Sequence, residues 1–511
     1  MKNICKVLGE VARRQPDTTA LVDCSCGRKR QLSFGDLDAI TAGGARQLTD
    51  AGLKPGDTVL FFHPVSIELY TALLSVFRAG MTAMFVDPSA GRAFIDACCA
   101  LREPQGFFGS PKAHLLRFGS RAVRQIPVKF HRGGRWLPGS WCWAPVAGER
   151  GAPSVGSGAP ALITFTSGST GRPKAVARSH EFLIAQHQAL ENALELRSGE
   201  VDLITLPVFT LANLGSGLTS VLADTDLAKP GEADVEKVAQ QIEATCVERV
   251  AASPAFFEAM LEKPGSLSKL KRISTGGAPV FPPLLERLAQ AAPEAEVFAV
   301  YGSTEAEPIA HVNQREISVE DLESMRAGGG LLVGEPVVEI ELRIIDDQWG
   351  TPIRDEPEAL PTGSVGEIVV SGDHVLSGYL NGVGDEETKF TIGGQIWHRT
   401  GDAGRLDDSG RLWLMGRCAA KMQHGSIYPF AVECALSFLP VVKRCAALEH
   451  EGKNVLAIEV TEGAEISEIR QLVGWAAFEH VIRMAEIPMD LRHQAKVDYG
   501  RLRKLLRSHL S

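Results

Sequence analysis

Hydroxyl groups, glycines and a lysine are concentrated in residues 164–174, Thr-Phe-Thr-Ser-Gly-Ser-Thr-Gly-Arg-Pro-Lys, directly after the apolar residues 161–163. Glycines let a backbone bend until its N–H groups face an anion, hydroxyl groups add donors, and a lysine adds a positive charge. We therefore predict a loop that binds the phosphates of a nucleoside triphosphate. Its binding residues would be Thr166, Ser167, Gly168, Ser169, Thr170, Gly171 and Lys174.

This loop differs from the Walker A loop of kinases and P-loop ATPases. A Walker A loop has a lysine and a serine or threonine directly after its second glycine, where this chain has Arg172 and Pro173. A P-loop ATPase is therefore disfavoured. A surface linker rich in serine and glycine is the alternative interpretation, and the motifs further along the chain argue against it.

A second polar run, Tyr-Gly-Ser-Thr-Glu at residues 301–305, follows the apolar stretch 297–300. Open α/β sheets bind ligands at the carboxyl ends of their strands, so this run predicts another part of the same site. The alternative is an ordinary turn from a strand into a helix, with the glutamate near the helix N-terminus.

Two further segments carry weaker signals. Residues 397–402 are Trp-His-Arg-Thr-Gly-Asp, and the carboxylate of Asp402 could accept charge-assisted hydrogen bonds from two hydroxyl groups. The run 407–410, Asp-Asp-Ser-Gly, predicts a hairpin turn to which we assign no ligand. The run 275–279, Thr-Gly-Gly-Ala-Pro, is by itself also typical of a plain turn.

Alternating strands and helices must position these polar segments. Apolar strand patterns at 58–62 and 83–86 alternate with helix patterns, which predicts an α/β parallel sheet. Strand patterns at 202–206, 249–252 and 297–300, with a helix over 234–244, predict a second sheet of the same type.

The later part of the chain has a different pattern. Short strands at 339–345 and 366–370 predict a small β subdomain, and the residues from Cys418 onward predict a compact α+β piece. We expect a core domain over residues 1–417 and a C-terminal domain over residues 418–511.

The motifs between positions 164 and 496 resemble, in order and spacing, those of the adenylate-forming superfamily: acyl-CoA synthetases, adenylation domains of peptide synthetases, and luciferases. Residues 32–36 and 52–57 also fit, so the resemblance covers essentially the whole chain. It implies an α/β fold with a large N-terminal domain of two α/β sheets and a small β subdomain, followed by a small mobile C-terminal lid.

The resemblance also implies roles for individual residues. The loop at 164–174 would bind the phosphates of ATP, Tyr301 would lie against adenine, and Asp402 and Arg417 would contact the ribose. Carboxylate and phosphate oxygens suit Mg2+, which the resemblance assigns to Glu305. The other implied nucleotide contacts are Gly276, Gly277 and Ala278 beside the adenine, Gly302 and Ser303, and Thr304 at the α-phosphate.

A late segment, residues 487–496, resembles the loop that carries the family's catalytic lysine, which makes Lys496 the candidate here. When a carboxylate attacks the α-phosphate, two anions approach one another, so a cation delivered to them lowers the barrier. The alternative is a solvated lysine near a basic C-terminal helix.

Several positions depart from the usual pattern of coenzyme A ligases. Ala419 stands where a hinge aspartate or lysine is usual, Thr210 replaces a histidine, and Gln494-Ala495 replaces Ser-Gly before the lysine. Together with Trp-His-Arg before Asp402 and the run 424–428, they resemble the branch that contains the olefin-pathway β-lactone synthetases.

That branch implies adenylation of a 2-alkyl-3-hydroxy fatty acid, followed by attack of its own 3-hydroxyl group and release of AMP. An intramolecular nucleophile has a high effective concentration, so no external thiol is needed. Transfer of the acyl group to coenzyme A remains the alternative. A nucleotide-binding paralogue without turnover is a third hypothesis.

An apolar run after the phosphate region predicts an acyl pocket lined by Val208, Phe209, Leu211 and Leu214, with Leu218 nearby. Such a stripe is also typical of plain core. An aliphatic acid is the most economical substrate. The residues near this run include no aspartate that would favour an amino acid as the substrate.

Composition narrows the remaining classes. The chain has 511 residues and a formal net charge of −9, which disfavours nucleic acid as a partner. Its ten cysteines form no CxxC pair, so we expect reduced thiols in the cytoplasm and neither a disulfide nor zinc. No apolar run reaches the ~20 residues of a membrane span, and the N-terminus does not resemble a signal peptide. Peripheral contact with a membrane at an acyl entrance stays open.

Overall fold

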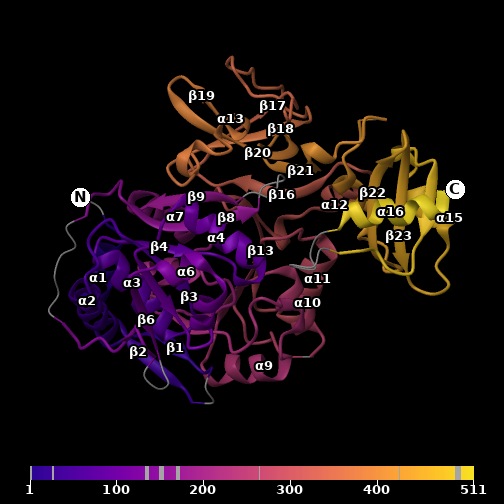
Figure 1. Cartoon of the computed structure of the whole chain (residues 1–511). Coiled ribbons are helices and arrows are strands. Elements are labelled where there is room, and N and C mark those ends of the chain that lie inside the picture. The colour runs from indigo at the N-terminus through magenta and orange to yellow at the C-terminus, as the bar shows by residue number, and fades with distance from the viewer. Residues whose placement is uncertain are drawn as a thin grey trace. The chain divides into compact units, whose positions relative to one another are not determined.

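The computed structural model describes residues 3–25, 28–132, 137–148, 155–167, 173–263, 265–424, 426–489 and 497–510. The chain forms two compact units. The first unit comprises Met1–Thr225, Gln240–Glu248 and Asp373–Glu386, and the second comprises Asp226–Ala239, Arg249–Gly372 and Glu387–Ser511. Figure 1 shows the helices and strands along the chain.

The first unit contains a seven-stranded sheet with the order β7-β6-β5-β3-β4-β8-β9. All neighbouring strands are parallel except β8 and β9, which are antiparallel. The strands are β3 (Thr58–Phe62), β4 (Thr82–Phe85), β5 (Gly106–Gly109), β6 (Val128–His131), β7 (Trp141–Cys142), β8 (Pro160–Ser167) and β9 (Pro173–Ser179).

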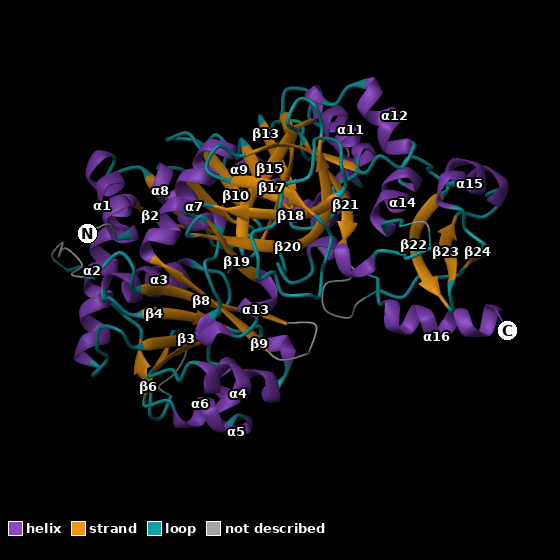
Figure 2. Ribbon diagram, turned by 90° about the horizontal axis from the view of Figure 1, so that it is seen from above, coloured by secondary structure: helices purple, strands orange, loops and turns teal. Residues whose placement is uncertain are grey.

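Side-chain alternation along β3 explains why both faces of this sheet are covered. Val59 and Phe61 belong to one buried cluster, whereas Leu60 and Phe62 belong to another, because successive side chains of a strand point to opposite faces. The second cluster includes residues of three neighbouring helices, which Figure 2 shows close together. These helices are α4 (Arg92–Leu101), α5 (Leu116–Gly119) and α6 (Arg121–Gln125).

A second group of strands in the first unit has the order β10-β11-β1-β2. Its strands are β1 (Thr19–Asp23), β2 (Arg30–Ser33), β10 (Val201–Ile204) and β11 (Thr219–Leu222). The other helices of this unit are α1 (Ile4–Arg14), α2 (Phe34–Asp50), α3 (Ile67–Arg78), α7 (His180–Ala193) and α8 (Phe209–Ser216).

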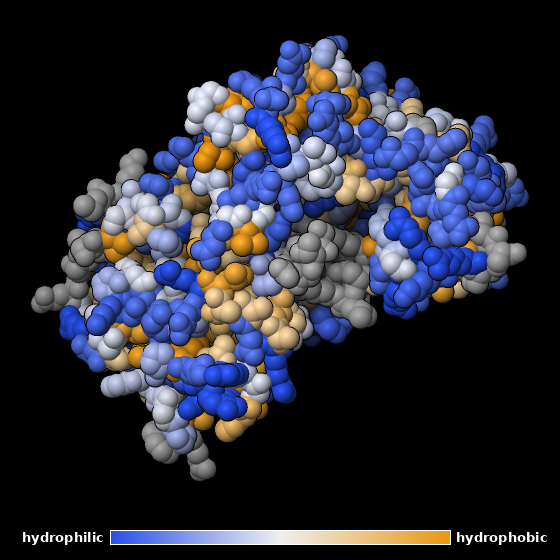
Figure 3. All heavy atoms as spheres, turned by 45° about the horizontal axis from the view of Figure 1, so that its top comes forward, coloured by the Kyte–Doolittle hydropathy of each residue, from blue (hydrophilic) through white to orange (hydrophobic). Residues whose placement is uncertain are grey.

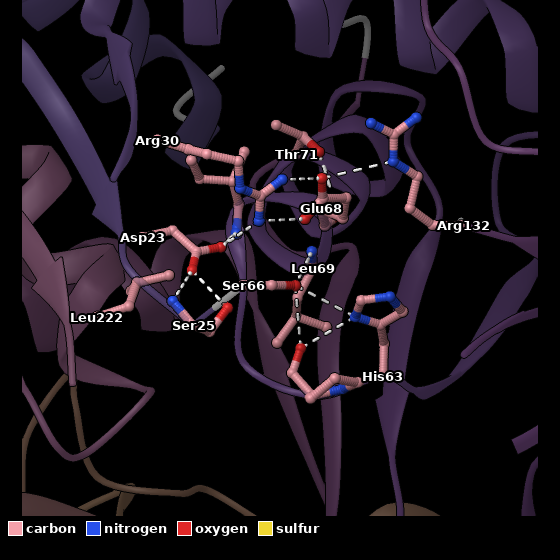
Figure 4. Close-up of polar contacts among 12 residues, drawn as sticks. Asp23, Ser25, Arg30, His63, Ser66, Glu68, Leu69, Thr71, Arg132 and Leu222 are labelled. Atoms are coloured by element: carbon pink, nitrogen blue, oxygen red, sulfur yellow. Dashed lines mark hydrogen bonds and ion pairs between the residues drawn. The ribbon is translucent and has the colours of Figure 1, made fainter. Parts of the chain in front are cut away.

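An ion-pair network ties the β1–β2 hairpin to α3 (Figure 4). The Arg30 guanidinium lies 2.5 Å from a carboxylate oxygen of Asp23 and 2.6 Å from one of Glu68. Arg132 approaches the same Glu68 carboxylate at 3.4 Å. The two arginines therefore neutralise the negative charges of two carboxylates, and one of these, Asp23, is buried. We interpret this network as structural.

The strands of the second unit follow the order β12-β13-β14-β15-β16-β21-β20-β18-β17, and β19 pairs with β20. The first three are parallel and the others antiparallel. The strands are β12 (Arg249–Ala252), β13 (Arg272–Gly276), β14 (Glu296–Ser303), β15 (Ala306–Asn313), β16 (Leu331–Pro336), β17 (Glu341–Ile345), β18 (Gly366–Ser371), β19 (Lys389–Ile392), β20 (Gln395–Leu406) and β21 (Leu412–Arg417).

The helices around these strands are short. Three belong entirely to the second unit: α10 (Pro254–Leu261), α11 (Pro282–Ala291) and α12 (Val319–Arg326). Two others, α9 (Val235–Ala244) and α13 (Asp385–Thr388), run across a boundary between segments of the two units.

The residues after position 418 form a small α+β piece within the second unit. Its three strands, in the order β22-β23-β24, are β22 (Val442–His450), β23 (Lys453–Val460) and β24 (His480–Arg483). The helices are α14 (Pro429–Leu436), α15 (Ile466–Leu472) and α16 (Tyr499–Leu510). The expected α/β class, with an α+β C-terminal piece, is confirmed, whereas the boundary at residue 418 stays a prediction.

Within the described ranges, no helix combines the length and apolar character needed to cross a membrane.

Candidate active site

The predicted phosphate loop connects β8 and β9, two antiparallel strands at one edge of the seven-stranded sheet. Thr166 on β8 pairs with Lys174 on β9, and Ser167 pairs with Pro173. A β-hairpin therefore presents the segment. Its residues Gly168, Ser169, Thr170 and Gly171 lie outside the described residues.

Lys174 packs against a segment that sequence reasoning missed. Its ammonium lies over the ring of Tyr379, 5.5 Å from the ring centroid. A Cβ at Gly384, which has φ +102°, would lie 2.5 Å from that ammonium nitrogen. Residue 384 must therefore be glycine for the lysine to keep this position. The sequence signal was weak, because Tyr379 and Gly384 lie in a polar, glycine-containing stretch that is typical of turns.

The second unit brings three predicted residues together. The hydroxyl group of Tyr301 donates to Asp402 Oδ2 at 2.7 Å, and Arg417 Nη1 donates to Asp402 Oδ1 at 3.0 Å. Asp402 on β20 and Arg417 on β21 are register partners, and Tyr301 lies near the end of β14. Both oxygens of the carboxylate thus accept hydrogen bonds, an arrangement that two sugar hydroxyl groups would also satisfy.

The electrostatics of this cluster keep the proton on the phenol. Burial and the Asp402 carboxylate raise the pKa of Tyr301 well above its usual value. The same carboxylate raises the pKa of Arg417. Tyr301 is therefore a hydrogen-bond donor, and the Arg417 side chain, which is 61% exposed, is a fixed positive charge at the edge of the cluster.

Thr400 and Arg399, which precede Asp402 on β20, hold Asp402 in place. Thr400 donates from its hydroxyl group to the carbonyl oxygen of Ile368 at 2.8 Å and accepts from the backbone N–H of Asp402 at 3.0 Å. The buried Arg399 guanidinium donates to both carboxylate oxygens of the buried Glu367, from Nε to Oε1 at 3.1 Å and from Nη2 to Oε2 at 2.6 Å. β18 thereby fixes the register of β20 next to Asp402.

Sequence reasoning missed the contribution of Glu367. The signal was present, since a glutamate within the apolar strand Gly-Glu-Ile-Val-Val requires a buried partner.

The residues 303–306 form a tight turn between β14 and β15. The Ser303 hydroxyl oxygen accepts from the backbone N–H groups of Glu305 and Ala306, each at 3.3 Å, and Ser303 is the register partner of Ala306. The alternative of a turn from a strand into a helix is therefore wrong. Thr304 is exposed and Glu305 is half-buried in this turn.

Glu305 fits a magnesium site by the chemistry of its side chain. Mg2+ is usually held by one or two carboxylates together with substrate phosphates and water. The negative charge of Glu305 also acts on Arg417, which places it in the electrostatic environment of the cluster.

The turn at Gly276–Ala278 lies beside the end of β14. Gly276 closes β13 as the register partner of Val300, and a Cβ there would lie 2.6 Å from the Val300 carbonyl oxygen. Gly277 has φ +77°. Both positions therefore require glycine, and Val300, the register partner of Gly276, directly precedes Tyr301.

The predicted acyl-pocket residues lie on α8 or, for Val208, directly before it. Val208 is 36% exposed, whereas Phe209, Leu211 and Leu214 are buried. Val208 and Leu211 line a small cavity together with Leu183, His187 and Leu190, and Leu214 lies in the core cluster of the first unit. The Thr210 hydroxyl group donates to the Tyr70 phenol oxygen at 2.8 Å, and Tyr70 donates to the Pro207 carbonyl oxygen at 3.0 Å.

Lys496 lies outside the described residues. Met489 and Val497, on either side of its segment, pair as an isolated bridge, and the Asp498 N–H donates to the Pro488 carbonyl oxygen at 2.8 Å. The two ends of the segment that carries Lys496 therefore lie together.

The family model for AMP-binding enzymes matches residues 8–380, so the chain belongs to the AMP-binding enzyme family. An olefin beta-lactone synthetase of Xanthomonas campestris pv. campestris is 31% identical over 98% of this chain and 96% of its own length. An olefin beta-lactone synthetase of Stenotrophomonas maltophilia is also 31% identical, over 98% of this chain and 97% of its own. The crystal structure of ATP-bound MatB from Rhodopseudomonas palustris has a TM-score of 0.78 at 19% identity and covers 100% of both chains.

These findings confirm the resemblance to adenylate-forming enzymes and the fold class. The chain is an adenylate-forming acid ligase.

Proposed function

We propose that this enzyme uses ATP and Mg2+ to convert a fatty acid, or a 3-hydroxy fatty acid, into an acyl-adenylate with release of pyrophosphate. The 3-hydroxyl group then closes a β-lactone with release of AMP. The main support is the 31% identity, over nearly the whole chain, to two olefin beta-lactone synthetases. The cluster of Tyr301, Asp402 and Arg417 supports the nucleotide half of the proposal.

In the first step, an oxygen of the acid attacks the α-phosphorus, and the bond from that phosphorus to the pyrophosphate breaks. We assign the β- and γ-phosphates to the hairpin that ends in Lys174, and the ribose hydroxyls to Asp402. Lys496 neutralises the charge of the two approaching anions, and Thr304 contacts the α-phosphate. Bound Mg2+, held by Glu305 and the phosphates, would supply further charge neutralisation.

In the second step, the 3-hydroxyl oxygen attacks the carbonyl carbon and the bond from that carbon to the AMP oxygen breaks. The hydroxyl proton passes to solvent as the four-membered ring closes. Adenylation supplies the leaving group, and the short tether supplies the effective concentration. Ala419 and Thr210, which replace residues usual in coenzyme A ligases, favour this fate over transfer to coenzyme A.

Mass spectrometry of the products tests the proposal. Purified enzyme is incubated with ATP, Mg2+ and a 3-hydroxy fatty acid, with and without coenzyme A. We expect a product lighter than the hydroxy acid by one water, formed without coenzyme A. The matched acid without the hydroxyl group should stop at the adenylate, which hydroxylamine traps as a hydroxamate.

The same assay separates the alternatives. A thioester that appears only with coenzyme A would identify a fatty acyl-CoA ligase and contradict the lactone step. Absence of pyrophosphate release with every acid in the panel would instead indicate a non-catalytic nucleotide-binding paralogue.

A further inference from the structure

Positive charge is segregated within one segment of an otherwise acidic chain. The formal net charge of the protein is −9, yet residues 104–148 contain five arginines, two lysines and no aspartate or glutamate. Such an asymmetry indicates an interaction surface for a negatively charged partner.

The same segment exposes large apolar side chains. Phe118 on α5 is 80% exposed, and Leu115 at the end of a short 3-10 helix (Ala113–Leu115) is 66% exposed. The face drawn in Figure 3 is mostly hydrophilic, with hydrophobic side chains distributed among the hydrophilic ones. Phe118 and Leu115 lie three residues apart and both side chains are available for an external contact.

Basic side chains surround these two residues. Lys112, Arg121 and Arg124 are exposed, and the guanidinium of Arg92 on α4 lies against Gly119, where a Cβ would be 2.9 Å from its Nε. We call the set Arg92, Lys112, Leu115, Phe118, Arg121 and Arg124 the basic apolar patch.

Backbone contacts give the patch a fixed shape. Arg124 donates from Nε to the carbonyl oxygen of Arg117 at 2.9 Å and from Nη2 to that of Phe118 at 3.2 Å. Asp96 accepts from the Ser120 hydroxyl group at 2.5 Å and from the Ala122 N–H at 3.3 Å. The Asp96 carboxylate is thus occupied by the start of α6, and α5, which carries Phe118, is held by the Arg124 side chain.

We propose that the basic apolar patch docks the enzyme on the surface of an anionic lipid membrane. The guanidinium and ammonium groups pair with lipid phosphates, while Phe118 and Leu115 insert at the boundary between headgroups and acyl chains. The choice of a membrane over an acidic protein rests on the proposed function, because a long-chain acid partitions into membranes and the enzyme would meet it there.

Sedimentation with lipid vesicles tests this docking without any turnover. The full-length protein is mixed with vesicles of phosphatidylcholine alone or of phosphatidylcholine with phosphatidylglycerol. We expect sedimentation only with the anionic vesicles, and release when NaCl is raised to about 0.5 M. Because no substrate is present, a failure of docking is distinguishable from a failure of the lactone chemistry.

Substitutions separate the two contributions of the patch. Lys112→Glu with Arg121→Glu should lower the vesicle partition coefficient at least about tenfold, because each basic side chain contributes separately to attraction by anionic lipid. Phe118→Ser should lower it about fivefold and leave the urea midpoint unchanged, because this side chain is exposed. The matched control is Arg14→Glu with Lys54→Glu, two exposed positions outside the segment that change the net charge equally.

The proposal is overturned if the protein does not sediment with anionic vesicles, which is the result expected for an acidic protein partner. It is also overturned if the control pair reduces sedimentation as much as Lys112→Glu with Arg121→Glu.

Discussion

At the scale of single residues, the most informative contact is the carboxylate of Asp402 between Tyr301 and Arg417. A phenol and a guanidinium already satisfy its two oxygens, so the carboxylate is oriented before any nucleotide binds. Such preorganisation lowers the cost of ordering the side chain on binding. The same residues that the sequence motifs singled out are therefore held in one geometry by β14, β20 and β21.

Asp402→Asn should weaken ATP binding at least about tenfold, because an amide replaces the charged acceptor of two donors. Isothermal titration calorimetry with ATP and Mg2+ measures the change. Asp407→Asn is the matched control, since Asp407 pairs with Arg411 within the hairpin turn that follows. That control should lower the stability and leave the ATP affinity unchanged; equal losses of affinity in both variants would contradict the role of Asp402.

Lys496→Ala should abolish most adenylate formation while ATP binding stays measurable, because its proposed charge acts on the transition state. Pyrophosphate release and ATP calorimetry read the two steps separately. The control is Lys504→Ala, an exposed lysine of α16. Full activity in Lys496→Ala would show that the late loop has been assigned wrongly.

At the scale of elements, β20 owes its register to the buried pair of Arg399 and Glu367, which are 1% and 0% exposed. Glu367→Gln leaves a buried guanidinium without its anion, and should lower the free energy of unfolding by about 3–5 kcal/mol. Urea unfolding measures the loss. Glu258→Gln breaks an exposed pair with Arg287 and should cost less than about 1 kcal/mol. Similar losses in the two variants would contradict the role given to the buried pair.

A hydrogen bond between Tyr499 on α16 and Glu433 on α14 connects these two helices, and the pKa of Glu433 is raised. Burial raises the pKa of Glu433 to about 7, and the Tyr499 hydroxyl group lies 3.4 Å from its Oε1. The folded state thus prefers the protonated carboxyl group, so the stability it contributes is present below about pH 4.5 and is lost as the pH rises through 7.

Glu433→Gln should therefore raise the free energy of unfolding at pH 8 by on the order of 1–3 kcal/mol, and change it little at pH 4.5. Urea unfolding at the two pH values measures the difference. A variant that loses stability at pH 8 would show that the ionised carboxylate is favoured by the fold, contrary to this account.

The strands themselves were largely predictable from local pattern. The run Thr58–Phe62 was predicted as a strand and forms β3 with the same bounds, because its apolar side chains are buried on both faces. The run 297–300 was predicted as a strand, but β14 continues to Ser303. The extension depends on antiparallel pairing with β15, which no pattern within the polar run 301–305 could reveal.

At the scale of the whole molecule, the order of the motifs indicated the enzyme class. The spacing of the motifs along the sequence did not predict which site residues contact one another in the fold. Tyr301 meets Asp402 although β15, β16 and β21 lie between β14 and β20 in the strand order, and this order depends on long-range pairing. The contact of Lys174 with Tyr379 and Gly384 likewise joins segments two hundred positions apart. Chemistry-bearing residue types could be predicted, whereas the contacts that support them, such as the pairing of Glu367 with Arg399, required the fold.

The central claim is that an acyl-adenylate forms and that its own 3-hydroxyl group then closes the lactone. An isotope experiment tests this claim most directly, with a 3-hydroxy acid that carries 18O in both carboxyl oxygens. The enzyme is supplied with this acid, ATP and Mg2+ without coenzyme A, and AMP and the acyl product are weighed by mass spectrometry. The account predicts one 18O in AMP, one in the lactone carbonyl and an unlabelled ring oxygen, because the ring oxygen comes from the 3-hydroxyl group. AMP without label, or a ring oxygen that carries it, would contradict activation through an acyl-adenylate followed by intramolecular closure.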